Sequence, residues 1–273
     1  MPEAPEIASR SIEMNTALKN KVIKSIEVTQ PKCLNLSVDE FSAALVTAMI
    51  QRVTYHGKWI KVYTSRGWLL LNLGMGGEIL LVTRDSLPQK YRLIFDFTDK
   101  TCLAVNFWWF GYAFHAKQDE LSSIPMIARL GPNVLDLTLE DFLTLLSCQK
   151  GKTRVKAFLL DQSKVAGIGN AYIHDILFIA RLHPNRLLVS LSDSERTELF
   201  NSIQAGLRPS LQKGGAFYET DLYGQKGRFS MEDILIGYKE GNACPNCGTP
   251  IEKIRTGSTS SFICPTCQPD PAL

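Results

Sequence analysis

Apolar and β-branched residues recur in short runs over the first 130 residues, and turns rich in glycine, aspartate or lysine separate the runs. This pattern is typical of short β-strands. A stretch with helical spacing, from about Glu3 to Leu18, precedes the runs. The opening part of the chain is therefore predicted to be a β-sandwich or barrel with attached helices. The predicted strands are Val22–Val28, Trp59–Tyr63, Trp68–Asn72, Ile79–Val82, Tyr91–Phe95 and Cys102–Phe107.

The pattern changes after a Gly-Pro-Asn break within residues 131–137, which we interpret as a linker. From about Leu139 to Gln212 the apolar spacing is helical, and the Ser-Asp-Ser-Glu run at 192–195 supplies a helix start with an acidic first turn. Residues 214–227 are rich in glycine and aromatic residues, a composition that favours a mobile surface loop. A cysteine-bearing hairpin is predicted for the last thirty or so residues.

Basic side chains are unevenly distributed along the chain. The net charge is +3, but residues 150–186 alone carry +5, because seven lysines and arginines stand there against Asp161 and Asp175. Such a run is either the solvated face of a helix or a surface for nucleic acid, and charge alone does not separate the two. The basic residues are Lys150, Lys152, Arg154, Lys156, Lys164, Arg181 and Arg186.

The length of the apolar runs and the spacing of the cysteines limit the classes of protein to which this chain can belong. No run reaches the roughly 18 to 20 apolar residues that span a bilayer, and the first twenty residues do not form a signal sequence. Of seven cysteines only four fall into paired spacing, and Cys33, Cys102 and Cys148 are expected to be buried thiols. This usage suits a reducing cytosol better than a disulfide framework. We expect a soluble cytoplasmic protein that does not contact a membrane.

Two CxxC turns indicate a metal centre. Cys244 and Cys247 form one turn and Cys264 and Cys267 the other, with sixteen residues between the turns. Each turn places two sulfurs on one side of a tight loop, and two turns complete a tetrahedral site with no open position. The sequence therefore predicts one structural Zn²⁺. Arg255 lies on the hairpin between the turns, where it either contacts phosphate or is merely a solvated strand residue.

A Gly-Ile-Gly turn at residues 167–169 lies inside the basic run, and a second helix is expected to begin at Asn170. Glycine lets backbone N–H groups approach an anion closely, and a helix N-terminus adds a favourable dipole. A phosphate seat is one interpretation; an ordinary helix connection is the other.

The N-terminus offers a candidate nucleophile. Met1 precedes a small residue, so its removal would expose the secondary amine of Pro2. An α-amino group has a pKa of about 7.7 to 8.0, so a useful fraction is unprotonated at neutral pH. Attack of this amine on a sugar C1′ would give an iminium, the electron sink that strand cleavage by elimination requires. Taken alone, Pro-Glu at a terminus is more often a frayed tail or a helix start.

Together these segments resemble the formamidopyrimidine-DNA glycosylase and endonuclease VIII family. The strings LLDQ, VAGIGNAY and LHPNR occur in this order between residues 159 and 186, between the Met-Pro-Glu opening and the cysteine hairpin. The resemblance implies an α+β multidomain protein: an N-terminal catalytic β-sandwich domain with flanking helices over residues 1–132, a helix-two-turn-helix DNA-binding domain over 133–229 and a zinc-ribbon β-hairpin over 230–273.

The resemblance also implies roles for individual residues. Pro2 is the expected nucleophile and Glu3 the general acid/base, with Glu6 supporting their geometry. Lys58, in the His-Gly-Lys-Trp turn, is the candidate that binds phosphate next to the lesion, although without the other motifs a solvated turn lysine would be preferred. The implied DNA-binding residues are Met75, which fills the gap left by a flipped base, with Trp109, Phe110, Lys156, Asn170 and Arg255.

Several positions depart from the family pattern. Ala4 is an allowed variation, Asn72 replaces a common histidine, and Asp175 replaces a glutamate. Trp109 stands where one branch of the family carries an arginine that contacts the cytosine opposite oxidised guanine. Thr259 stands where the ribbon normally carries a phosphate-binding arginine, and Arg255 is the nearest substitute.

The function expected from the resemblance is excision of oxidised or otherwise damaged bases, with AP lyase activity through a Pro2 Schiff base. The expected partner is double-stranded DNA with damaged bases or abasic sites, bound by a monomer associated with a bacterial nucleoid. The alternative is a non-catalytic or weakly active protein that binds damaged or abasic DNA on the same scaffold. The preferred base and its opposite base are not determined by the sequence.

Overall fold

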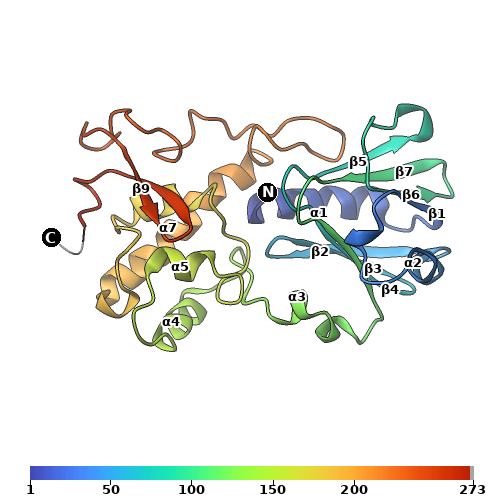
Figure 1. Cartoon of the computed structure of the whole chain (residues 1–273), viewed down its shortest axis with the longest axis horizontal. Helices are drawn as coiled ribbons and strands as arrows, with labels where there is room; N and C mark the ends of the chain where they lie inside the picture. Colours follow the sequence, from blue (N-terminus) through green and yellow to red (C-terminus); the bar gives the residue numbers. More distant parts are fainter. Residues whose placement is uncertain (271–273) are drawn as a thin grey trace. The chain divides into compact units, whose positions relative to one another are not determined.

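The protein is described here by a computed structural model that covers residues 1–270. The chain forms two compact units (Figure 1). Residues 1–129 and the segment 213–229 make up the first, and residues 130–212 and the chain from 230 onward make up the second. Segment 213–229 thus groups with the β-rich unit, and the cysteine hairpin groups with the helices.

Two antiparallel four-stranded sheets form the first unit, in the orders β1-β6-β7-β5 and β2-β3-β4-β8. Apolar side chains of both sheets, such as Phe95 and Leu103 of one and Val62 and Leu69 of the other, share one buried core. This confirms the expected β-sandwich. The strands are β1 (Ile23–Val28), β2 (Ile50–His56), β3 (Trp59–Thr64), β4 (Gly67–Asn72), β5 (Glu78–Thr83), β6 (Leu93–Phe97), β7 (Thr101–Asn106) and β8 (Tyr112–Ala116).

The pattern of apolar residues did not predict strands β2 and β8. Strand β2 carries Arg52 on an exposed position, and its guanidinium lies 5.2 Å from the ring centroid of Tyr63 and 5.7 Å from that of Trp68. Stacking of a cation on aromatic rings lets a charged residue occupy the outer face of a sheet. A polar residue in a strand of this kind weakens the alternation on which the prediction depends.

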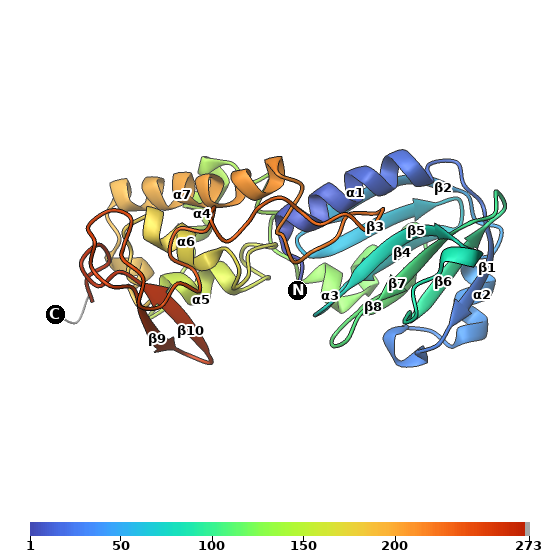
Figure 2. The same ribbon diagram turned by 90° about the horizontal axis from the view of Figure 1, so that it is seen from above.

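Helices flank the sandwich. The long helix α1 (Ala4–Leu18) lies along the sheet that contains β2 (Figure 2) and buries Ile7, Met14 and Leu18, which confirms the helix expected from Glu3 to Leu18. The other helices of this unit are the short 3₁₀ helices η1 (Pro31–Cys33), η2 (Arg84–Ser86) and η3 (Leu121–Ser123), with α2 (Val38–Leu45) and α3 (Pro125–Ala128).

The second unit is helical and confirms the predicted α domain. Helices α6 and α7 pack closely, because a Cβ on Gly206 of α7 would lie only 2.6 Å from Cγ1 of Ile176 on α6. Residues 170–172 form a turn, so the helix expected to begin at Asn170 begins three residues later. The helices are α4 (Leu139–Ser147), α5 (Val155–Leu160), α6 (Ile173–Ile179), η4 (Leu188–Ser190) and α7 (Asp193–Gln212).

The predicted cysteine hairpin consists of β9 (Glu252–Thr256) and β10 (Thr259–Ile263), and a small core joins it to Phe178 of α6. Cys33 and Cys102 are buried as expected, whereas Cys148 is exposed, because it follows the last turn of α4 instead of facing the helix packing. Within residues 1–270, none of the helices combines the length and the apolar character that a membrane span requires.

Candidate active site and zinc centre

Pro2, Glu3 and Glu6 lie together at the start of α1. Pro2 is buried, and Glu3 and Glu6 are only 4% and 6% exposed. Glu3 is the N-cap residue: its backbone N–H donates to Oε2 of Glu6 at 2.9 Å, and its own carboxylate accepts the backbone N–H of Glu6. This reciprocal capping fixes the first turn of the helix. The terminus is therefore an ordered element and not a frayed tail.

The loop at 213–229 packs onto this helix start. The N–H of Ala216 donates to Oε1 of Glu6 at 3.1 Å, and the N–H of Leu222 donates to Oε2 of Glu13 at 2.9 Å. Gly215 has φ +100, and a Cβ there would lie 3.0 Å from Cγ of Glu6. Glycine is needed at this position for both the backbone conformation and the close approach. The composition suggested a mobile loop, but these contacts hold it against α1.

A further carboxyl, that of Glu219, belongs to the same site, and the sequence did not point to it. Burial raises the pKa of Glu219 to about 7, and the nearby Glu6 carboxylate acts in the same direction. The chain N-terminus, Arg10 and Lys226 oppose this rise in the pKa. Only the packing of the loop on α1 brings residue 219 to the N-terminus, so no local sequence signal could have identified it.

Lys58 lies in the two-residue turn between β2 and β3, next to the paired residues His56 and Trp59, and is half-buried. The side chain of Asn72 supports this turn: its Nδ2 donates to the carbonyl oxygen of Lys58 at 3.2 Å, while its Oδ1 accepts the N–H of Gly74 at 3.0 Å. The residue that replaces the usual histidine thus links the lysine turn to the loop that carries Met75.

Met75, Trp109 and Phe110 come from two loops that are joined by backbone hydrogen bonds. The N–H of Met75 donates to the carbonyl of Trp109 at 2.9 Å, and the N–H of Trp108 donates to the carbonyl of Met75 at 3.0 Å. Gly74, with φ +53, permits this approach, because a Cβ there would lie 2.1 Å from the carbonyl oxygen of Trp109.

The side chains on these two loops project from a fixed backbone. Met75 is 50% exposed, Trp109 65% and Phe110 67%, and Trp108 is equally exposed. A cluster of large apolar side chains that are exposed to solvent is typical of a binding surface. We refer to Met75, Trp108, Trp109 and Phe110 below as the apolar wedge.

Lys156 does not project toward solvent from α5 but is 4% exposed. Its Nζ donates to the hydroxyls of Thr256, Thr259 and Ser261 at 2.8–2.9 Å and to the carbonyl of Ser260 at 2.7 Å. Burial lowers the pKa of Lys156 to about 8. The side chain that the sequence suggested for the DNA backbone therefore joins α5 to the tip of the β9–β10 hairpin.

The Gly-Ile-Gly turn is held by Gln162. Its Oε1 accepts the N–H of Gly167 at 3.0 Å, and its Nε2 donates to the carbonyl of Ile168 at 2.9 Å. Gly167 has φ +121, a backbone conformation that favours glycine. Asn170 follows the turn and is exposed, and its carbonyl accepts the hydroxyl of Tyr238 at 3.2 Å. The three residues of the turn are buried and the N–H of Gly167 is occupied by Gln162, so Asn170 is the exposed residue of this segment.

Asp175 holds the chain that leads into the zinc hairpin. Its carboxylate accepts the backbone N–H groups of Leu235, Ile236 and Gly237 at 2.7, 3.0 and 2.9 Å. Burial raises the pKa of Asp175, although the three N–H donors act in the opposite direction. This structural role was not evident in the sequence, because the three donors lie about sixty residues later in the chain.

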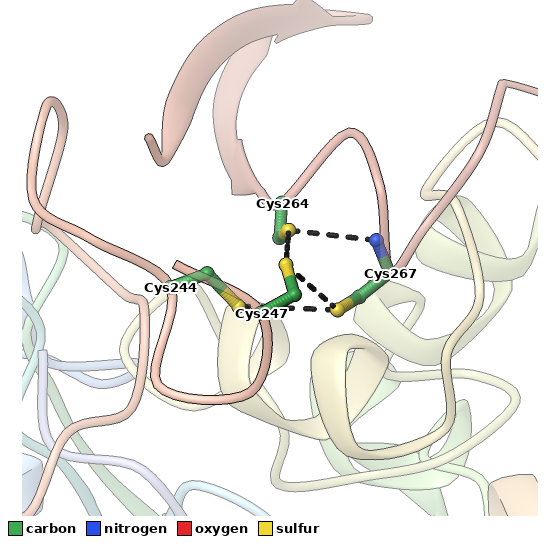
Figure 3. Close-up of side chains that lie close together, drawn as sticks. All are labelled: Cys244, Cys247, Cys264 and Cys267. Carbon is green, nitrogen blue, oxygen red and sulfur yellow. Dashed lines mark hydrogen bonds between the residues drawn. The ribbon is translucent and has the colours of Figure 1, made fainter. Parts of the chain in front are cut away.

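The four cysteine sulfurs converge as the two CxxC turns predicted (Figure 3). The sulfurs lie within 4.8 Å of one another, and three of the pairs are 3.4, 3.6 and 3.9 Å apart. Four Zn–S bonds of about 2.3 Å in a tetrahedron separate the sulfurs by about 3.8 Å. The residues therefore fit one structural zinc ion, and Arg255 lies exposed on β9 outside this centre.

Comparisons with known protein families match the chain in three parts. The formamidopyrimidine-DNA glycosylase N-terminal domain matches residues 1–106, the formamidopyrimidine-DNA glycosylase H2TH domain matches residues 130–221, and a zinc finger found in FPG and IleRS matches residues 241–269. The last match agrees with the cysteine cluster and supports zinc as the metal.

Similar proteins cover almost the whole chain. The formamidopyrimidine-DNA glycosylase of Haemophilus influenzae is 31% identical and that of Streptococcus pneumoniae 32%, each over 98% of this chain and 99% of the relative. The Lactococcus lactis Fpg, solved in complex with abasic-site DNA, superposes with a TM-score of 0.89 at 27% identity over 98% of this chain and 100% of that one. The chain therefore belongs to the formamidopyrimidine-DNA glycosylase family.

Proposed function

We propose that this protein is a DNA base-excision repair glycosylase with associated AP lyase activity, and that Pro2 forms the covalent link to DNA. The observation that carries the proposal is the order of the N-terminus: Pro2 and Glu3 are buried at the start of α1, beside the doubly hydrogen-bonded Glu6. A secondary amine held in this way, in a chain of this family, has the position that a nucleophile requires.

The reaction follows from the chemistry of this amine. After removal of Met1, the lone pair of the Pro2 nitrogen attacks C1′ of a nucleotide flipped out of the duplex. The C1′–base bond breaks, and its electron pair leaves with the base. Opening of the sugar ring gives an iminium, which makes the C2′ proton acidic, so its removal expels the 3′ phosphate and cuts the strand. Glu3 is the proposed general acid/base for these proton transfers.

Proposed DNA contacts come from each part of the chain. Lys58 binds a phosphate next to the lesion, and the apolar wedge fills the gap left by the flipped nucleotide. Asn170, which follows the Gly-Ile-Gly turn, and Arg255 on the hairpin bind the DNA backbone. Lys156 supports this binding indirectly, since its ammonium group is occupied by the hairpin tip.

The proposed substrates are ring-opened purines and oxidised pyrimidines. Two of the similar Lactococcus lactis structures, at 26% and 27% identity, contain an N7-benzyl-Fapy-dG and an oxidised pyrimidine in DNA. The indole of Trp109 offers one N–H and a large stacking face, whereas an arginine would read the opposite cytosine with its fork of donors. We therefore expect weak activity on 8-oxoguanine. The proposed setting is a monomer on the nucleoid of a bacterial cytoplasm.

A panel of end-labelled duplexes, each with one lesion, tests the proposal. Strand breaks that appear after alkali report base excision, and breaks that appear without alkali report the lyase step. We expect both for a ring-opened purine, and neither for Pro2→Gly. Tight binding to abasic-site DNA without base release from any duplex would instead support the non-catalytic damaged-DNA binder.

A further inference from the structure

Glu219 occupies the middle of a loop segment whose path is fixed on both sides. On one side the N–H of Ala216 is bound by Glu6, and on the other the N–H of Leu222 is bound by Glu13. Between them the hydroxyl of Thr220 donates to Glu78 at 2.9 Å. The backbone of Glu219 is itself tied within the loop, because its N–H donates to Ala216 and its carbonyl accepts from Gly227.

The charged groups that face Glu219 come from two elements and the chain terminus. The charges that act on Glu219 include those of Glu6 and Arg10 on α1, of Lys226 in the loop and of the N-terminal amine. Arg10 is also influenced by Glu13, with which it forms an ion pair of 3.1 Å, and by Asp221. Loss of Met1 transfers the amine to Pro2, which lies buried at the start of the same helix.

Hydrogen bonding distinguishes Glu219 from the other two carboxyls at the terminus. Glu6 accepts a backbone N–H on each of its oxygens, and Glu3 accepts the N–H of Glu6. These donors occupy both oxygens of Glu6 and tie the carboxyl of Glu3 to the first turn of α1. Among residues 1–270, no side chain or backbone group forms a hydrogen bond or ion pair with the Glu219 carboxyl.

We propose, on the basis of the function proposed above, that Glu219 is the group that takes the proton from the N-terminal ammonium and so keeps Pro2 nucleophilic. In this step one N–H bond of the ammonium breaks and the proton moves to a carboxylate oxygen of Glu219. The electron pair of that bond remains on the nitrogen as the lone pair that attacks C1′. The loop thereby contributes to the chemistry as well as to the shape of the site.

The pKa of Glu219 lies close to the general value for an N-terminal amine. The pKa of Glu219 is about 7 because the half-buried carboxyl is desolvated and because the charge of Glu6 acts on it. An N-terminal amine has a pKa of about 7.7 to 8.0. A proton acceptor is most effective when its pKa lies near the working pH and near that of the donor, because the charged acceptor is then available and the transfer costs little.

The pH dependence of single-turnover adduct formation tests this role. Wild type, Glu219→Gln and the control Asp119→Asn, which removes an exposed carboxylate, are mixed with abasic-site DNA and borohydride at pH values from 6 to 9. We expect Glu219→Gln to be about tenfold slower than wild type at pH 7. The deficit should shrink to less than threefold at pH 9, where the amine loses its proton without help, and Asp119→Asn should match wild type throughout.

Each other outcome contradicts the role. A deficit of the same size at every pH would mean that Glu219 only holds the loop, and a variant faster than wild type at pH 7 would mean that the carboxylate only keeps the amine protonated. Absence of any adduct with wild type would contradict the proposed function itself. In that case, carbon-13 NMR titration of the Glu219 carboxyl still tests the electrostatic coupling between Glu219 and the terminal amine. Blocking the amine removes its positive charge and should raise the pKa of Glu219.

Discussion

The carboxylate of Glu6 accepts a hydrogen bond of 3.1 Å from the backbone N–H of Ala216, which lies 210 residues further along the chain. Its other oxygen accepts the N–H of Glu3. One buried side chain therefore positions both the segment that carries the proposed nucleophile and the loop that carries Glu219. The loop would otherwise have to be ordered by its glycine-rich backbone alone, at a large cost in conformational entropy.

Replacement of Glu6 by glutamine should loosen this arrangement. The amide offers one acceptor oxygen where two N–H donors are bound, so one buried donor loses its partner at a cost of about 1–3 kcal/mol. Urea unfolding should show this loss in the free energy of unfolding. The control Glu198→Gln, at an exposed position on α7, should change it by less than about 0.5 kcal/mol. Equal stability of the two variants would mean that the Glu6 contacts contribute nothing.

Zinc should support DNA affinity without taking part in the reaction. Four thiolates leave no open coordination position, so the ion cannot activate water or substrate. We expect native mass spectrometry to find one zinc per chain. Cys264→Ser should weaken binding to abasic-site DNA more than tenfold, while adduct formation at saturating DNA is retained. A protein without bound metal, or a variant with full affinity, would contradict this role of the hairpin.

Lys156→Met should destabilise the protein in a pH-dependent way. The pKa of Lys156 is about 8 in the folded chain because the ammonium is buried, whereas an exposed lysine has a pKa of about 10.4. Between these values the unfolded chain binds more protons, so the stability of wild type relative to the variant rises with pH.

The expected result is therefore a larger destabilisation by Lys156→Met at pH 10 than at pH 7, measured by urea unfolding at both values. Lys152→Met, at an exposed position, serves as the control and should show no such trend. A destabilisation that decreases with pH would mean that the hydroxyls of the hairpin tip stabilise the charged form more than burial disfavours it.

The residues differ in how far the sequence could predict them. The cysteine cluster and the helix after Pro2 depend on local spacing in the sequence. The structure confirms each of these two predictions. The position of Lys156 in a basic run suggested that it binds phosphate. Its side chain instead donates to hydroxyls that lie about a hundred residues away in the sequence, which the run itself could not indicate. Glu219 and Asp175 likewise act through contacts between distant segments, which no periodicity or motif in the chain encodes.

Trp109 should make excision tolerant of the opposite base. Stacking on an indole is worth roughly 1–3 kcal/mol per base and depends little on base identity. The single-turnover rate of excision of a ring-opened purine should vary by less than about tenfold among the four opposite bases. This range corresponds to about 1.4 kcal/mol in activation free energy. Trp109→Arg should introduce a preference for cytosine. Rapid removal of 8-oxoguanine confined to cytosine pairs by the wild type would overturn this account of the apolar wedge.

The identity of the nucleophile is tested most directly by mapping the borohydride-trapped adduct. Protein with its natural N-terminus is incubated with abasic-site DNA and borohydride, digested, and analysed by mass spectrometry. We predict loss of Met1 and a single linkage at the nitrogen of Pro2, within the peptide that ends at Arg10, and no adduct with Pro2→Gly. A linkage at an internal lysine, or undiminished trapping by Pro2→Gly, would contradict the central claim that the buried N-terminal proline carries out the chemistry.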